Sequence, residues 1–186
     1  DTAWPRAQAA QSPEELAEVL RTSRWGETDE QSALRDLLTL ARLGRLSTES
    51  VASRPWARAH AGLIVSRLLL VDGATPSRRL RQLARPLLGD RWATATTFGE
   101  LRDALPRPAQ ALLADLEEPT ELWLAEARHH ATVEADALRL LRAALPGPDV
   151  VLGGVTVLAV DAWRVRAALA AAATGAGGSE VLDAVA

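Results

Sequence analysis

The chain has 186 residues, of which 48% are apolar, and its 21 positively charged residues are all arginines set against 24 carboxylates. This near-balance of charge, with so much apolar content, excludes a disordered tail, a collagen-like chain and a generally basic nucleic-acid coat protein. The lack of cysteine excludes disulfide frameworks, thiolate zinc sites and cysteine nucleophiles. We therefore expect a folded chain whose core consists of packed apolar side chains.

The apolar residues recur at intervals of three and four along most of the chain, which is the spacing of amphipathic helices. This pattern predicts an all-α fold of about eight helices in an irregular bundle. The predicted helices cover approximately residues 12–22, 29–43, 53–71, 75–87, 97–105, 108–116, 119–145 and 149–173.

Hydroxyl residues and glycines mark several of the predicted helix ends. Ser12 stands at an N-cap position, and Gly44 is predicted to stop the second helix. Thr75 and Pro76 are predicted to start the fourth helix as a cap followed by a proline. The uncharged stretch 150–160 is too short to cross a bilayer, so it is predicted to be a buried core helix.

Two of the predicted helix starts have similar sequences. Residues 12–20 match residues 97–105 position by position, each with a hydroxyl cap, an acid three residues later and leucines at helical spacing. Ordinary amphipathic helix starts share this pattern, so two interpretations stay open. The chain is a single all-helical domain, residues 1–186, with or without an internal repeat of modules 1–93 and 94–186.

One predicted helix, residues 119–145, carries a spacing that is typical of metal ligands. The residues concerned are Glu126, His129, His130 and Glu134. Dinuclear carboxylate sites need two Glu-x-x-His pairs and two further glutamates, and the chain has three histidines in all. We therefore predict no metal and interpret the four residues as a partly buried polar cluster. Arg128 or Arg139 is expected to complete this cluster.

The densest group of basic residues lies around the predicted helix 75–87. We call it the arginine patch, and it consists of Arg78, Arg79, Arg81, Arg85 and Arg91. Residues 1–110 carry 16 arginines and 13 carboxylates, whereas residues 111–186 carry 5 arginines and 11 carboxylates. Three interpretations of the patch stay open: a solvated face with local acid partners, a docking face for a protein, or a site for the phosphates of nucleic acid or lipid.

Aromatic residues and candidate nucleophiles complete the set of candidate functional residues. Most of the six tryptophans are predicted to be core anchors, and any exposed one to mark an interface. They are Trp4, Trp25, Trp56, Trp92, Trp123 and Trp163. His60 is expected in the core or at its boundary. Because the serines occupy predicted caps or loops and no nucleophile motif is present, we expect a protein without catalytic residues and without a cofactor.

Residues 10–26 combine a capped Ser-x-x-Glu-Leu-x-x-x-Leu helix with the sequence Arg-Thr-Ser-Arg-Trp-Gly. This combination resembles a module that is repeated in one family, the C/d-type subunits of archaeal and V-type ATP synthases. Residues 85–105 are similar to a second copy. Residues 150–186 resemble the last part of the family, with Asp-Ala-Trp-Arg-Val-Arg, then Gly-Ala-Gly-Gly, then Glu-Val-Leu.

The resemblance implies a mechanical role. It implies a non-catalytic helical coupling or adaptor protein, with the ATPase rotor ring and central stalk as protein partners and no small-molecule substrate. Such a protein is expected in the cytoplasm, at the periphery of a membrane. The alternative hypothesis is a regulatory helical domain that binds nucleic acid or another anionic partner through the arginine patch, although the patch contains no motif that reads a nucleic-acid groove.

Overall fold

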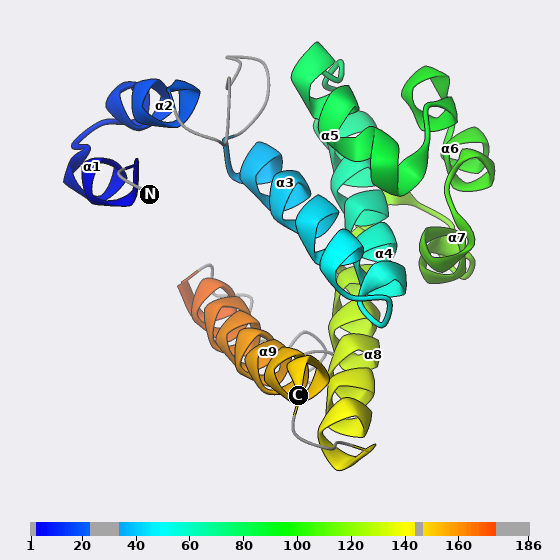
Figure 1. Ribbon diagram of the computed structural model, residues 1–186. Coiled ribbons are helices and arrows are strands. Elements are labelled where there is room, and N and C mark those ends of the chain that lie inside the picture. The colour runs from blue at the N-terminus through cyan, green and yellow to red at the C-terminus, as the bar shows by residue number, and fades with distance from the viewer. Residues whose placement is uncertain (1–2, 23–33, 144–146, 174–186) are drawn as a thin grey trace. The chain divides into compact units, whose positions relative to one another are not determined.

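The computed structural model describes residues 3–22, 34–143 and 147–173 (Figure 1). Within these ranges the chain forms nine α-helices and no strand, which confirms the predicted all-α class. The chain divides into two compact units, Asp1–Ala111 and Leu112–Ala186. The interpretation of two sequence repeats concerns similarity between segments, and it stays a prediction.

The first unit contains six complete α-helices and most of a seventh. They are α1 (Ala3–Ala9), α2 (Pro13–Arg21), α3 (Leu34–Glu49), α4 (Arg54–Ser66), α5 (Arg78–Leu88), α6 (Phe98–Ala104) and α7 (Arg107–Leu113). A π-helical turn, Arg67–Val71, continues α4, and a 3-10 turn, Arg91–Thr94, follows α5.

The second unit contains the end of α7, a 3-10 turn and two long helices. The turn is Pro119–Glu121, and the helices are α8 (Leu122–Ala143) and α9 (Pro148–Ala173). Both helices follow the predicted ranges closely, because prolines stand at or just before their first turns.

The two helix starts with similar sequences, in residues 12–20 and 97–105, have the same capping arrangement. The Ser12 hydroxyl accepts a hydrogen bond from the Glu15 backbone N–H at 3.1 Å, and the Glu15 carboxylate accepts one from the Gln11 N–H at 2.8 Å. The Thr97 hydroxyl likewise accepts from the Glu100 N–H at 3.2 Å. These bonds satisfy backbone donors that have no partner inside a helix, which is why α2 and α6 begin at these residues.

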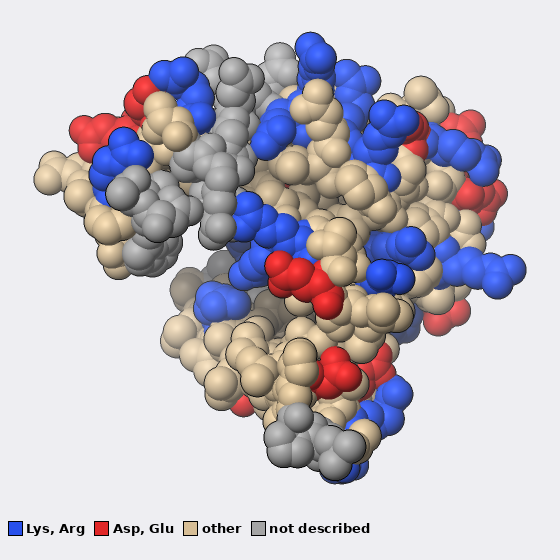
Figure 2. Space-filling model, in the orientation of Figure 1, with Lys and Arg blue, Asp and Glu red and all other residues tan. Residues whose placement is uncertain are grey.

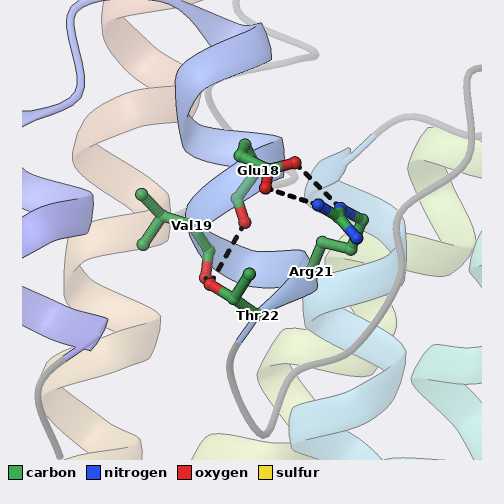
Figure 3. Close-up of polar contacts among 4 residues, drawn as sticks. All are labelled: Glu18, Val19, Arg21 and Thr22. Atoms are coloured by element: carbon green, nitrogen blue, oxygen red, sulfur yellow. Dashed lines mark hydrogen bonds and ion pairs between the residues drawn. The ribbon is translucent and has the colours of Figure 1, made fainter.

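The C-terminus of α2 also ends as predicted, at Thr22 (Figure 3). The Thr22 hydroxyl donates to the Val19 carbonyl oxygen at 3.1 Å, so a side chain satisfies a carbonyl of the last turn. The Arg21 guanidinium donates to the Glu18 carboxylate at 2.8 Å on the same turn. Both groups are exposed, and the pair therefore adds little to stability.

Two predicted helix ends are wrong. The helix α3 does not stop before Gly44 but continues to Glu49, because an interior glycine costs only about 1 kcal/mol and does not break the hydrogen-bond ladder. The helix α5 does not start at Thr75 and Pro76. Its cap is Ser77, whose hydroxyl accepts the Leu80 N–H at 3.0 Å.

The core of the first unit lies where α3, α4 and α5 pack on one another. Its most deeply buried side chains include Leu40, Ala57, Ala61, Val65, Leu80 and Ala84. Small residues on α4 let neighbouring helices approach closely. A methyl group at Gly62 would lie 2.5 Å from the Ala109 Cβ of α7, so only glycine fits at this position.

The second unit is built on the contact between α8 and α9, which lie side by side in Figure 1. Gly153 of α9 is buried against α8, and a Cβ there would lie 2.8 Å from the Ala137 carbonyl oxygen and 3.0 Å from Leu141 Cγ. Gly154, the next residue, has open space where a Cβ would stand. The close approach of the two helices therefore depends on Gly153.

The prediction that residues 150–160 form a buried core helix is wrong. They lie in α9, where Gly153 and Val160 are buried but Val151, Val155 and Leu158 are exposed. The helix has an apolar surface on more than one side, and α8 covers only one side. Among the residues that the structure describes, no helix combines the length and the hydropathy needed to span a bilayer.

Alanine substitutions at the two neighbouring glycines of α9 test this packing. Each substitution raises the helix propensity by the same amount. The difference in the free energy of unfolding between the two variants therefore isolates the contact with α8. We expect Gly153→Ala to be less stable than Gly154→Ala by about 1–3 kcal/mol, the usual cost of overpacking. Urea unfolding followed by circular dichroism measures the difference. Equal stabilities would show that α8 and α9 do not approach as described.

Candidate functional site

The first candidate site lies on α8. Glu126, His130 and Glu134 are spaced four residues apart and therefore share one side of the helix. His129 lies on the adjoining side and is buried, together with Val133. The structure thus divides the four predicted residues into one buried imidazole and three groups at the edge of the contact with α9.

Trp163 of α9 joins two of these groups. Its indole ring stacks on the imidazole of His130, with centroids 4.0 Å apart and an angle of 25° between the planes. Its Nε1–H donates to Glu126 Oε1 at 3.2 Å, and His130 Nε2 lies 4.0 Å from the same oxygen. Glu126 is therefore held by the neighbouring helix through the tryptophan.

Arg164 of α9 holds the third group, Glu134. Its Nη1 and Nη2 donate to the two carboxylate oxygens at 2.7 and 2.6 Å, so the pair is bidentate. This hydrogen bonding lowers the pKa of Glu134 below its ordinary value of 4.5 and raises that of Arg164. Arg164 Nη1 also lies 3.4 Å from Asp161 Oδ1, one turn earlier in α9.

The partners predicted for this cluster are wrong. Arg128 pairs with Asp115 at 3.5 Å, and Arg139 pairs with Asp136 within α8. Spacing along one helix favoured these arginines because they are near in sequence. Arg164 is thirty residues from Glu134, and only the packing of α9 on α8 brings them together.

The α8–α9 polar cluster, as we call Glu126, His130, Glu134, Trp163 and Arg164, links two helices. Each of its carboxylates accepts hydrogen bonds from α9. No group of three or more acidic or imidazole side chains that could hold a metal ion occurs in residues 3–22, 34–143 and 147–173. The chemistry that this arrangement supports is the positioning of α9 on α8 by charge and aromatic stacking.

The second candidate site is the arginine patch. Leu80, Ala84 and Leu87 of α5 are buried in the first unit, and this places Arg78 and Arg81 on the exposed side of the helix. Figure 2 shows basic side chains gathered over α5. The structure thus supports one part of the sequence interpretation, namely that these arginines lie at the surface.

The members of the patch differ in their partners. Arg85 pairs with Asp90 at 3.1 Å, and both side chains are well exposed. Arg79 is half-buried. Arg78, Arg81 and Arg91 are exposed, and within the described ranges they form no ion pair with a carboxylate. The patch therefore presents three exposed cations that no carboxylate of the described ranges neutralises.

The tryptophans divide between core and surface. Trp56 and Trp92 are buried, as predicted for core anchors, and the Trp92 indole donates to the Gly89 carbonyl oxygen at 3.0 Å. Trp163 is half-buried in the α8–α9 polar cluster, and Trp123 is exposed. The side chain of Trp4 and all of Trp25 lie outside the described residues.

An ion pair with a buried carboxylate in the first unit was not predicted. Arg67, at the end of α4, donates to both oxygens of the buried Asp36 of α3 at 2.7 Å. His60 lies at the core boundary, as expected. Two causes lower the pKa of its imidazole to about 4: burial, which is the larger, and repulsion from Arg42 and other arginines. Spacing along the chain did not indicate the pair of Arg67 and Asp36, because the two residues come from different elements.

No family model, curated protein or solved structure matches the chain. The resemblance of residues 10–26, 85–105 and 150–186 to a rotary ATPase subunit therefore stays a prediction. Part of the matching sequence, residues 23–26 and 174–186, lies outside the described residues. The fold and the sites define an all-α protein of two helical units.

Removal of the Glu134 charge tests the α8–α9 polar cluster. The lowered pKa of Glu134 means that its stabilisation is present above pH 4.5 and is lost as the pH falls through the folded-state pKa. We expect Glu134→Gln to lower the free energy of unfolding at pH 7 by about 1–2 kcal/mol, and the deficit to shrink toward pH 3. Urea titrations at both pH values measure it.

The matched control for this test is Asp115→Asn, which breaks the more exposed pair with Arg128. We expect a loss below about 0.5 kcal/mol at pH 7, as is usual for surface pairs. Equal losses in the two variants would show that Glu134 does not link α8 to α9.

Acid titration tests the environment of His60. Because its pKa falls from 6.5 in the unfolded chain to about 4 in the folded one, its contribution to stability is complete above pH 6.5 and is lost as the pH falls toward 4. We expect the chain to lose stability more steeply than His60→Gln in this window, by up to about 1 kcal/mol per pH unit. An NMR titration of the imidazole that gives an ordinary pKa near 6.5 would contradict this account.

Proposed function

We propose that this chain is a non-catalytic coupling or adaptor protein that connects protein partners at a membrane. The precedent for this role is the family that the sequence resembles, whose members stand between the rotor ring and the central stalk. The observation that carries the proposal is the group of exposed arginines on and just after α5, namely Arg78, Arg81 and Arg91, which pair with no carboxylate among the described residues. The opposite side of α5 is buried.

The arginine patch suits a protein partner with an acidic surface. Arg78, Arg81 and Arg85 project from α5, whose apolar side is packed against α3 and α4, so the spacing of these charges is preset before binding. Opposite charges on a partner would speed association and fix its orientation. The first unit carries 16 of the 21 arginines, so the positively charged residues are concentrated in that unit.

A coupling protein also has to transmit force without changing shape. The α8–α9 polar cluster supports this requirement, because the Glu134 carboxylate and the Arg164 guanidinium meet in two parallel hydrogen bonds. The close approach at Gly153 adds packing that leaves no room for a methyl group. Both features favour a structural use of these residues over a catalytic one.

The alternative function is a regulatory domain that binds nucleic acid through the same arginines. Proteins that bind single strands usually combine cations with exposed aromatic rings on which bases stack. Trp92, the aromatic residue nearest to the patch in sequence, is buried and bonded to Gly89. This observation favours a protein partner over a nucleic acid.

Affinity capture from membranes tests the proposal. We expect the tagged chain to recover components of a rotary ATPase ring or stalk. The triple variant Arg78→Gln, Arg81→Gln, Arg91→Gln is expected to recover at least about tenfold less, because each lost ion pair at an interface weakens binding by roughly 0.5–1 kcal/mol. Quantitative mass spectrometry of the captured proteins measures the ratio.

The control removes three exposed arginines from outside the patch, in the triple variant Arg58→Gln, Arg107→Gln, Arg142→Gln. It changes the net charge equally and should leave the recovery unchanged. Recovery of unrelated soluble proteins alone would overturn the proposal. Steeply salt-dependent binding to DNA or RNA, lost in the patch variant only, would establish the alternative.

A further inference from the structure

The apolar side of α9 that α8 leaves uncovered is the largest group of exposed hydrophobic side chains in the described residues. Val151, Val155, Leu158, Val165 and Leu169 are each between 60% and 69% exposed. Single exposed apolar residues are common on proteins, but a continuous row of them marks an interaction surface. These five residues follow one another along α9 at intervals of three, four or seven residues, so they lie on one side of the helix and form such a row.

The row has the spacing of a coiled coil. Two further exposed residues of α9, Ala162 and Ala172, fill the gaps between its large members. We call the complete set the apolar stripe, and it consists of Val151, Val155, Leu158, Ala162, Val165, Leu169 and Ala172. The intervals alternate strictly between four and three residues, which is the a and d pattern of about three heptads. Such a narrow seam fits one partner helix better than a broad apolar surface.

The stripe does not overlap with the side of α9 that packs on α8. That side contains Gly153, Val160 and Ala171, all of them buried. It also contains Trp163 and Arg164 of the α8–α9 polar cluster. A partner helix on the apolar stripe would therefore leave the contact between α8 and α9 intact.

The charges beside the stripe favour a second copy of α9 in parallel orientation. In the heptad frame of the stripe, Asp161 occupies a g position and Arg166 the e position five residues later. In a parallel pair each g residue faces the following e residue of the other helix, so Asp161 of each copy would face Arg166 of the other. In an antiparallel pair like charges would face each other. Both side chains are exposed, and Asp161 also lies 3.4 Å from Arg164 of its own helix.

A membrane surface fits the stripe less well. Helices that lie in the bilayer interface carry several lysines or arginines along the border of their apolar side. The border of the stripe carries one acid and one arginine, Asp161 and Arg166, which cancel. In Figure 2 the part of the surface over α9 that faces the viewer shows few charges.

We propose that α9 pairs in parallel with α9 of a second copy of this chain, through the apolar stripe. The two Asp161 to Arg166 contacts set the orientation of the pair. The inference does not rest on the function proposed above, because it uses residues of a different unit from the arginine patch.

Sedimentation equilibrium of the full chain, at concentrations from about 2 to about 200 μM, tests the pairing. A coiled coil of about three heptads is expected to pass from monomer to dimer within this range. We expect the double variant Val155→Glu, Val165→Glu to weaken the dimer at least about tenfold. The matched control is Val51→Glu, Val71→Glu, which changes two exposed valines of the first unit and should leave the dimer unchanged.

Single cysteines test the orientation, since the chain has no cysteine of its own. Val151→Cys and Val165→Cys each place a thiol at a d position, where two parallel helices bring identical residues within disulfide reach. We expect both variants to form a cross-linked dimer under mild oxidation. Charge reversal adds a second readout: Asp161→Arg should weaken the dimer, and Arg166→Asp in the same chain should restore it.

Three outcomes would overturn the inference. The first is a chain that stays monomeric at about 200 μM, the upper end of the range over which such a pair is expected to form. The second is a dimer that survives the glutamates in the stripe or that fails to cross-link at either cysteine. The third is a monomer that binds phosphatidylcholine and phosphatidylserine vesicles through the stripe, which would assign this surface to a membrane.

Discussion

The number of neighbours that a helix has limits how much of its surface it can bury. The helix α9 has apolar residues on several sides, and in the part of its unit that the structure describes its extensive packing is with α8. The side that faces α8 is closely packed at Gly153 and Val160. The opposite side keeps its valines and leucines in contact with solvent, at a cost of roughly 25 cal/mol for each Å² that a partner could cover. This constraint connects the packing of the second unit with its capacity for association.

Polar contacts between helices complement the apolar packing in both units. In the second unit Arg164 spans from α9 to Glu134 of α8. In the first unit Arg67, which begins the π-helical turn after α4, spans to the buried Asp36 of α3. In each pair the guanidinium donates to both oxygens of the carboxylate, so the pair fixes the relative orientation of the two segments as well as the distance between them. Arginine suits this use because its guanidinium keeps its charge at any ordinary pH. Arg78 and Arg81 of α5 form no such pair with a carboxylate in the described part of the chain.

The sequence-based predictions succeeded where one helix contained all the information. The caps at Ser12 and Thr97 and the ranges of α8 and α9 follow from local hydrogen bonding and from apolar spacing, and the structure agrees with them. The predicted end at Gly44 failed because the rest of α3 supplies enough packing to carry a glycine. The four candidate residues of α8 were found, but Trp163 and Arg164 were missed, since no rule of spacing links them to α8.

The sequence by itself determined the all-α class, most helix starts and the separation of arginines from carboxylates along the chain, because these depend on neighbours within a few residues. Only the tertiary structure decided which apolar side of α9 is covered, since an apolar residue does not specify its neighbour. It also decided which arginine meets Glu134 and which arginines remain available to a partner. Pairing across helices depends on directions and distances that a linear pattern does not contain.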